Sequence, residues 1–349
     1  MKKLLVYPFT PETVPLVRYR EMLPAHSEVI PVVEKGATIV EGTDVSHLDG
    51  GTSCGITITS CFEEILAFVD DVMFTGAINS MEDFRRYFAL AKEKGKNIFF
   101  CGNFHKSLNI DLESYQRLSY SDYNTDVSRD DKMHHIPVPI VLVTGMGQSC
   151  NKFDIQLGLR KKLHELEYKV SQVGTKEYST LFGIHAVPQF PSIPLWRKVL
   201  LYNRYFKDII DREDSEILVV GIPGGIMPID DWHNELFGET AIAIAKSLAP
   251  DVSILSMYLG KVDNESLNDI CNYTKYAMGA QLDYFHLSGT KLIFEHDMRT
   301  INYLTTDNTN VFDGQDAIDS RFFNVFSGDT SNAVYESVIS QLQNNIEII

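Results

Sequence analysis

A loop between residues 144 and 152 has the composition of a phosphate-binding loop. It follows a nearly all-apolar run, 140–143, and it contains Gly145, Gly147 and Lys152. Successive backbone N–H groups at a helix N-terminus can surround an anion, and a lysine there adds positive charge. After the lysine, apolar residues recur at a helical spacing. We therefore expect a strand, a glycine-containing loop, a lysine and a helix, in the order typical of P-loop proteins.

The loop departs from the usual pattern, G-x-x-x-x-G-K-[ST], at two positions. Asn151 stands where the second glycine is usual, and Phe153 replaces the hydroxyl residue that would bind Mg²⁺. Asparagine tolerates left-handed backbone angles better than most residues, so the loop can survive the first change. The second change removes a metal ligand, and Asp154 is the nearest oxygen donor. We expect a phosphate ligand without magnesium bound in the usual way.

Hydrolysis of a nucleotide would also need an acid at the end of a neighbouring strand. The strand predicted over 216–220 leads instead into the glycine-rich segment 221–225, so we predict binding of a nucleotide or another phosphate-bearing ligand. The residues expected to contact it are Gly145, Gly147, Gln148, Ser149, Asn151, Lys152, Gly224 and Gly225. Lys152 is expected to be exposed and to contribute little to stability. Two alternatives stay open: a tight turn with a solvated lysine, and a retained fold that has lost binding.

A second segment, 221–238, collects groups that can do acid–base chemistry. It follows a predicted buried strand, and open α/β sheets bind ligands at the carboxyl ends of their strands. Carboxylates beside a histidine can exchange protons or bind a cation. The candidate catalytic residues are Asp230, Asp231, His233 and Glu235. The alternative is a helix N-terminus capped by Asp230 or Asp231, with His233 at the surface.

Short apolar runs alternate with helical patterns, which predicts an α/β protein with parallel sheets. The first strands are expected at 4–7, 29–33, 69–74 and 98–101, with a helix over 81–94. Later strands are expected at 140–143, 169–173, 216–220, 252–257 and 290–294, with helices after Lys152, over 241–248 and near 333–343.

These elements predict two domains. Residues 1–105 read as a small Rossmann-like parallel-sheet domain, and residues 136–349 as a degenerate P-loop-like α/β domain. Residues 106–135 change in character, with few aliphatic side chains after Leu118, and are expected to form a linker or a surface loop.

Composition and charge exclude several classes of protein. The 349 residues include 31 Lys and Arg against 47 Asp and Glu, a formal net charge of −16. This disfavours nucleic acid and anionic membranes as partners, because both need a basic face. The five cysteines form no C-x-x-C pair, so no zinc site or disulfide framework is predicted. With no apolar run near the roughly 18–20 residues of a membrane span and no signal peptide, we expect a cytoplasmic protein.

The opening residues resemble a known family. The segment 3–10, Lys-Leu-Leu-Val-Tyr-Pro-Phe-Thr, with Val17-Arg18-Tyr19 after it, is similar to the clostridial peptide-maturation-system proteins. The resemblance covers most of the chain, including 221–225 and 237–239. Those proteins are encoded in clusters for ribosomally made, modified peptides, often beside radical SAM maturases. The resemblance therefore implies a precursor peptide and a radical SAM maturase as partners.

The two-domain plan also resembles, more distantly, bacterial proteins with a Rossmann-like first domain and a P-loop second domain. Some of those proteins are N-acyltransferases for D-amino acids. The segment from Gly145 to Lys152 matches their G-x-D-x-x-x-G-K-like loop in place, and 173–175 and 183–188 look like the segment that follows. Because Asn151 and Phe153 depart from that pattern, acyl transfer is not carried over to this chain.

We therefore expect an accessory protein of a natural-product peptide maturation system, with a degenerate P-loop that binds a nucleotide or another phosphate ligand. One alternative is a transferase or ligase acting on a peptide or amino acid, which requires Asp230, His233 and Glu235 to face Lys152. The other is a non-catalytic partner of the precursor peptide or the maturase, with an acidic surface that attracts basic leader segments.

Overall fold

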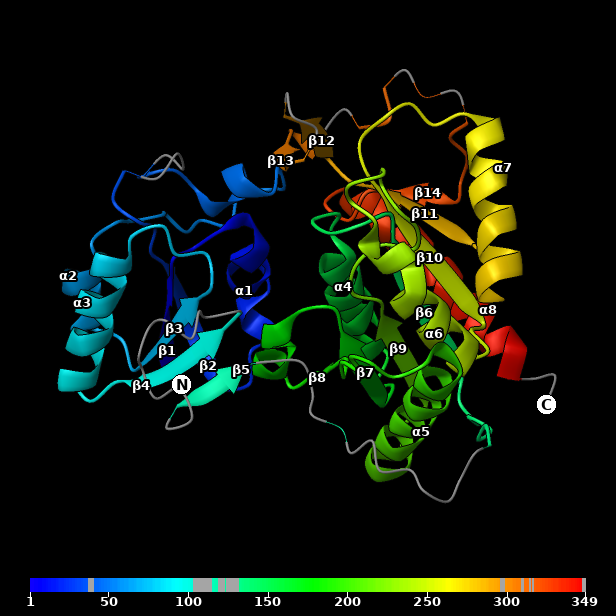
Figure 1. Cartoon of the computed structure of the whole chain (residues 1–349), viewed down its shortest axis with the longest axis horizontal. Coiled ribbons are helices and arrows are strands. Elements are labelled where there is room, and N and C mark those ends of the chain that lie inside the picture. Colours follow the sequence, from blue (N-terminus) through cyan, green and yellow to red (C-terminus); the bar gives the residue numbers. More distant parts are fainter. Residues whose placement is uncertain are drawn as a thin grey trace. The chain divides into compact units, whose positions relative to one another are not determined.

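The computed structural model divides the chain into two compact units (Figure 1). The first unit comprises residues 1–120 and 177–186, and the second comprises 121–176 and 187–349. The residues that the structure describes are 1–36, 41–102, 115–118, 123, 132–295, 299–308, 311–313, 315 and 317–346. Among these residues, no helix has both the length and the apolar character that a membrane span requires.

The division of the chain differs from the predicted one. Strand β5, Gln116–Leu118, lies inside the predicted linker but belongs to the sheet of the first unit. This strand was not predicted, because its three residues include a single apolar side chain. Residues 177–186 fall within the predicted second domain but are grouped with the first unit. Much of the predicted linker, including 103–114 and 124–131, lies outside the described residues.

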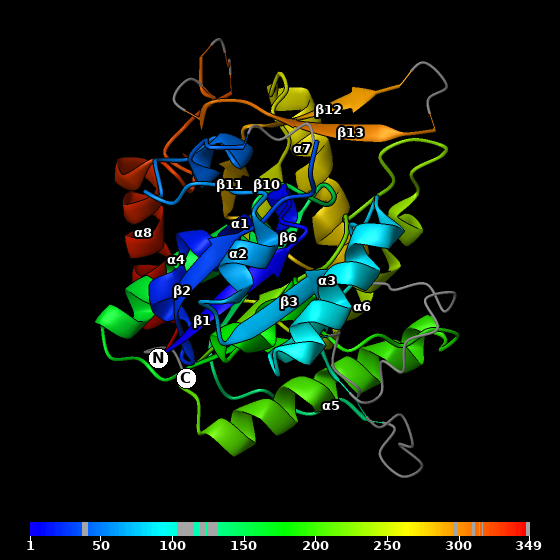
Figure 2. The same cartoon turned by 90° about the vertical axis from the view of Figure 1, so that its left-hand side faces the viewer.

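The first unit contains the predicted Rossmann-like parallel layer. Its sheet has the order β2-β1-β3-β4-β5, and each neighbouring pair is parallel. The other strands are β1 Lys2–Tyr7, β2 His26–Pro31, β3 Asp71–Thr75 and β4 Asn97–Cys101. The helices are α1 Val14–Arg18, α2 Phe62–Leu66 and α3 Met81–Glu93. Figure 2 shows α2 and α3 in front of this sheet, where their apolar side chains share one core with β1, β3 and β4.

The second unit is built on a larger sheet, in which the strands of this unit have the order β14-β11-β10-β6-β9-β7. The pairs from β14 to β7 are parallel. Its strands are β6 Ile140–Gly145, β7 Val170–Gly174, β9 Ile217–Gly221, β10 Val252–Met257, β11 Tyr284–Leu287 and β14 Phe322–Phe323. The two-residue strand β8, His185–Ala186, falls among the residues grouped with the first unit. The predicted α/β class with two parallel-sheet units is therefore confirmed.

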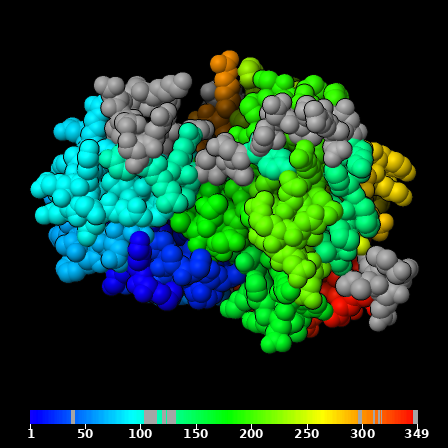
Figure 3. Space-filling view, turned by 90° about the horizontal axis from the view of Figure 1, so that it is seen from below, coloured from blue at the N-terminus to red at the C-terminus, as the bar shows by residue number. Residues whose placement is uncertain are grey.

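The helices of this unit are α4 Lys152–Glu165, α5 Leu195–Glu213, α6 Glu239–Ser247, α7 Asn264–Tyr273 and α8 Gly328–Ile346. Apolar side chains of α4 and α8 form one core with β6, β9 and β10. Helix α5 lies at the surface of this unit and forms part of the green area in Figure 3. The segment predicted as a strand over 290–294 forms β12, Thr290–Phe294, in an antiparallel hairpin with β13, Ile301–Thr305, outside the large sheet.

The core beneath α4 should control the stability of the second unit. Leu159 is fully buried in this core, whereas Leu166, just after the helix, is half exposed. We expect Leu159→Ala to lower the free energy of unfolding by about 2–5 kcal/mol, because it removes buried methylene groups and leaves a cavity. Leu166→Ala is the matched control, expected to change it by less than about 0.5 kcal/mol. Urea unfolding followed by circular dichroism measures both, and equal losses would contradict this packing.

Candidate phosphate-binding site

The loop after β6 turns into α4 as predicted. β6 ends at Gly145 and α4 begins at Lys152. Asn151, the residue before the helix, has φ 64° and ψ 21°, a left-handed conformation that glycine adopts most readily. Its carbonyl accepts a hydrogen bond from the N–H of Ile155 at 3.1 Å, which starts the helix. Asparagine thus takes the place of the usual glycine, as its tolerance of such angles predicts.

Lys152 lies inside the loop, and the expectation of an exposed lysine is wrong. The residue is only 7% exposed. Its Nζ donates hydrogen bonds to the backbone carbonyls of Gly147 and Gly224, the latter at 2.7 Å. The stem passes directly beneath Gly145, where a Cβ atom would lie 2.9 Å from Lys152 Cδ. One ammonium group therefore joins the loops that follow β6 and β9.

Two further glycines leave no room for a side chain, Gly147 beneath the side chain of Tyr258 and Gly225 against the backbone of Met146. A Cβ atom on Gly147 would lie 2.4 Å from the hydroxyl of Tyr258, which also donates a hydrogen bond to the carbonyl of Gln148. A Cβ atom on Gly225 would lie 2.5 Å from the carbonyl oxygen of Met146. Burial raises the pKa of Tyr258, so its hydroxyl stays protonated and able to donate. The two loops thus pack backbone against backbone, and Tyr258 covers the first of them.

Buried polar side chains of the sheet support the loop from below. Ser256, on β10, donates a hydrogen bond to the carbonyl of Cys150, and His286 Nδ1 lies 2.9 Å from the same hydroxyl oxygen. Burial lowers the pKa of His286 to about 3, so the ring is neutral. Because Ser256 uses its only proton on Cys150, the proton of His286 sits on Nδ1 and is donated to Ser256. Ser288, just after β11, donates to Asn151 Oδ1 at 2.6 Å.

The two residues after Lys152 are buried. Phe153, at the position of the usual hydroxyl ligand, is 1% exposed and belongs to the hydrophobic interior. Asp154 is also buried, and its Oδ2 accepts a hydrogen bond from Asn151 Nδ2 at 3.2 Å. No group of three or more metal-ligating side chains occurs in the part of the chain that the structure describes. The loop therefore has no hydroxyl side chain at the position of the usual magnesium ligand.

Asp230 and His233 form a local pair after β9. The Asp230 carboxylate accepts hydrogen bonds from the backbone N–H groups of Trp232 and His233, at 2.8 and 2.7 Å, and lies 2.9 Å from His233 Nδ1. His233 Nε2 lies 3.0 Å from the carbonyl oxygen of Arg299. The hydrogen bond with Asp230 raises the pKa of His233. Desolvation opposes ionisation of Asp230, but the hydrogen bonds from His233 and the backbone together lower its pKa.

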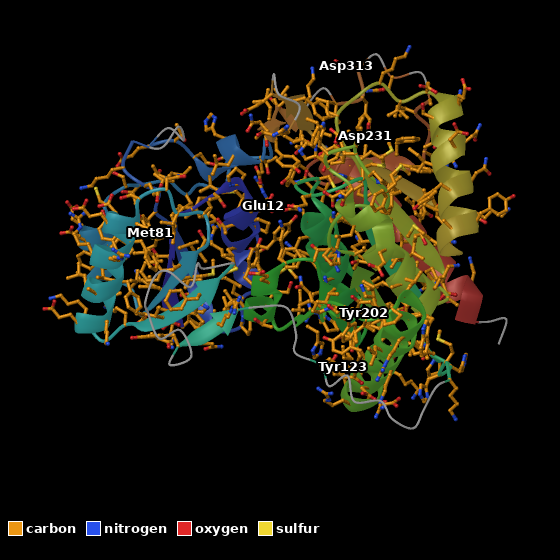
Figure 4. The ribbon with its side chains drawn as sticks, in the orientation of Figure 1. Glu12, Met81, Tyr123, Tyr202, Asp231 and Asp313 are labelled. Carbon is orange, nitrogen blue, oxygen red and sulfur yellow. The ribbon has the colours of Figure 1, made fainter. Side chains whose placement is uncertain are left out.

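The remaining predicted catalytic residues take two different positions. Asp231 is exposed (Figure 4). Neither it nor Asp230 caps the following helix, because α6 begins at Glu239 with Gly238 as its N-cap. Glu235 does reach the candidate site, where its Oε2 accepts a hydrogen bond from the N–H of Gly225 at 2.9 Å. The four residues thus do not form one cluster: Glu235 contacts the site, and Asp230 and His233 bind each other.

Glu235 is held there by a strained backbone. Glu235, Leu236 and Phe237 have φ values of 45°, 52° and 54°, and Gly238 follows with 70°. Left-handed angles cost roughly 1–2 kcal/mol for a residue with a Cβ atom. Leu236 and Phe237 are 67% and 70% exposed, so burial of their side chains does not offset this cost. Strain of this kind concentrates at functional sites.

The comparisons with known proteins concern the fold. No protein-family model matches the chain, and no curated protein matches it. The crystal structure of a DUF1611 family protein from Anabaena variabilis is similar with a TM-score of 0.59 and 13% identity, covering 82% of this chain and 88% of that one. This likeness shows a shared fold over most of the chain.

Two further solved structures are similar over shorter stretches. The apo GTPase from Pyrococcus abyssi gives a TM-score of 0.27 at 16% identity, covering 43% of this chain and 66% of that one. Chloroplast FtsY from Physcomitrella patens gives 0.29 at 15% identity, covering 47% and 53%.

Replacing Lys152 by methionine should destabilise the second unit. Methionine keeps the stem but removes the ammonium group that donates to the carbonyls of Gly147 and Gly224. Since hydrogen bonds to charged groups contribute about 1.5–3 kcal/mol, we expect the free energy of unfolding to fall by roughly 2–4 kcal/mol. Lys161→Met, at an exposed position of the same helix, is the control. Equal stability of the two variants in urea would show that Lys152 is not held inside the loop.

Neutralising Asp230 should lower the pKa of His233. The hydrogen bond with the carboxylate favours the imidazolium, so the pKa of His233 lies above its ordinary value in the wild type. We expect Asp230→Asn to shift it downward, as followed by NMR titration of ¹³C-labelled histidine side chains. Asp231→Asn, one residue away and exposed, should leave it unchanged. The stabilising effect of the pair is present below the unfolded pKa of histidine and fades as the pH rises through the raised folded value.

Proposed function

We propose that the second unit binds a phosphate-bearing ligand at the N-terminus of α4, with a nucleotide as the first candidate. The observation that carries the proposal is the position of Lys152, inside a loop that passes from β6 into α4 through the left-handed Asn151. Such a loop directs backbone N–H groups, the positive end of the helix dipole and a lysine toward one point. On binding, phosphate oxygens take the place of the two carbonyls that Lys152 now contacts.

The proposed activity is binding without hydrolysis. Phe153 fills the position from which a hydroxyl would bind magnesium, and it is part of the core. Replacing it by threonine to restore the usual pattern would empty that core position, so the sequence difference is built into the fold. The glycines at 145, 147 and 225 keep the loops close enough for one ligand to contact both.

We further propose that the protein serves a peptide maturation system as an accessory protein. The support is the resemblance carried by residues 3–10, of which Leu4 to Tyr7 are buried in β1. A precursor peptide and a radical SAM maturase are the proposed partners, and the net charge of −16 suits a basic leader segment. Copurification of the tagged protein with each partner tests this, and failure to retain either would contradict it.

A non-catalytic binding role is the second candidate function. It is favoured by three mostly exposed apolar side chains in the segment that follows β9: Trp232, Leu236 and Phe237. Exposed apolar groups that lie together often mark protein interaction surfaces. If Lys152→Met supports peptide maturation as well as the wild type does, this second function gains over ligand binding.

Isothermal titration calorimetry tests the ligand directly. We expect wild-type protein to bind at least one of ATP, GTP and acetyl-CoA, and Lys152→Met to weaken that binding by roughly 10–150-fold, the equivalent of 1.5–3 kcal/mol. Lys161→Met should bind like the wild type. Circular dichroism at the titration temperature confirms that each variant is folded. No binding of any of the three ligands at millimolar concentration would contradict the proposal.

A further inference from the structure

The strained segment after β9 places a carboxylate group, that of Glu235, at the candidate phosphate site. Glu235 Oε2 accepts a hydrogen bond from the N–H of Gly225 at 2.9 Å. The neighbouring residue, Gly224, gives its carbonyl to Lys152 Nζ at 2.7 Å. The carboxylate therefore binds the same short glycine segment that holds the loop lysine. It uses a backbone N–H group of the kind that a phosphate would use.

The backbone that delivers this carboxylate is under strain. Left-handed angles run through Glu235, Leu236 and Phe237. The turn is maintained by local contacts, since the side chain of Asn234 accepts a hydrogen bond from the N–H of Leu236 at 2.9 Å. Leu236 and Phe237 are exposed, so the turn is not fixed by a packed core. Loss of the contact between Glu235 and Gly225 would let the segment relax toward right-handed angles.

We propose that Glu235 is an internal anion that competes with the phosphate ligand for this site. The inference rests on the proposed function and adds its regulation. An entering phosphate takes the N–H of Gly225 and attracts Lys152, and the repulsion between two neighbouring anions expels the carboxylate. The turn at 235–237 then relaxes, so that ligand binding is read out as a change in the segment 229–238.

Trp232 offers a direct signal for this change. It lies three residues before Glu235, is exposed, and is covered by the guanidinium of Arg299, which lies 4.8 Å from the ring centroid. The chain has one other tryptophan, Trp196, at the start of α5. In a Trp196→Phe background, the fluorescence of Trp232 reports on the segment alone. We expect its emission to change on addition of tripolyphosphate or ATP in the presence of EDTA.

Removing the charge of Glu235 should strengthen binding. Glu235→Gln keeps the size and the hydrogen-bond acceptor but removes the repulsion, so we expect it to bind tripolyphosphate about tenfold more tightly than the wild type at low salt. Asp231→Asn makes the same change of charge on the same segment, at an exposed position, and should leave the dissociation constant unchanged. The difference should shrink as the salt concentration rises.

A second variant tests the strain in the opposite direction. Leu236→Gly makes the left-handed turn easier to keep, because glycine adopts these angles readily. It should therefore hold Glu235 in place and weaken tripolyphosphate binding severalfold, and Glu235→Gln combined with it should remove that loss. This variant keeps the proposal testable if Glu235→Gln proves poorly folded.

The outcomes separate this inference from the function on which it rests. Tighter binding by Glu235→Gln with an unchanged Asp231→Asn supports both. Equal binding by the wild type, Glu235→Gln and Asp231→Asn leaves the phosphate site standing and overturns the competition. If neither the wild type nor Glu235→Gln binds tripolyphosphate or ATP, the phosphate site itself is wrong, and the inference is overturned with it.

Discussion

Two backbone carbonyls, those of Gly147 and Gly224, meet on the ammonium group of Lys152, and the rest of the candidate site depends on this interaction. A buried ammonium group must be hydrogen-bonded, because its desolvation is otherwise too costly. The two carbonyls belong to different loops, so satisfying this one group fixes the loop after β6 against the loop after β9. The close packing then excludes a side chain at Gly145 and at Gly225.

The site is supported unequally on its two sides. Toward the sheet, Ser256 donates a hydrogen bond to the carbonyl of Cys150 and is itself held by neutral His286. Ser288 donates a hydrogen bond to the side chain of Asn151. These groups lie on or beside strands that are buried in the core. Toward solvent, Glu235 is held by a turn with left-handed angles and exposed side chains. A rigid support on one side and a strained segment on the other is an arrangement suited to binding with local movement.

The buried strands could be predicted from the sequence because a short apolar run bounded by glycine or proline rarely forms anything other than a buried strand. β6, β9 and β10 lie within two residues of their expected ends. The helix at 195–213 was missed, although it follows Pro194 and carries an amphipathic pattern. β11 was missed because its sequence, Tyr-Phe-His-Leu, includes His286, whose burial depends on a hydrogen bond to Ser256. Whether such a segment becomes a buried strand depends on contacts with distant segments, and these contacts cannot be read from a single sequence.

In the candidate site, too, local properties could be predicted from the sequence and contacts between distant residues could not. The left-handed Asn151 follows from the conformational tolerance of asparagine, a local property. The burial of Lys152 does not, since it requires Gly224, far along the chain. Glu235 could be selected as a candidate from its residue type, but its contact with Gly225 requires left-handed angles at residues that rarely adopt them. The residue types of the site could therefore be predicted from the sequence, but the contacts between distant residues could not.

A crystal structure of the protein with tripolyphosphate or ATP tests the phosphate site most directly. We expect electron density for phosphate at the N-terminus of α4, within hydrogen-bond distance of Lys152 Nζ and of backbone N–H groups of the loop. We also expect that Lys152 no longer contacts the carbonyl of Gly224. Density for the ligand elsewhere, with Lys152 still bound to Gly147 and Gly224, would show that this loop is not the phosphate site.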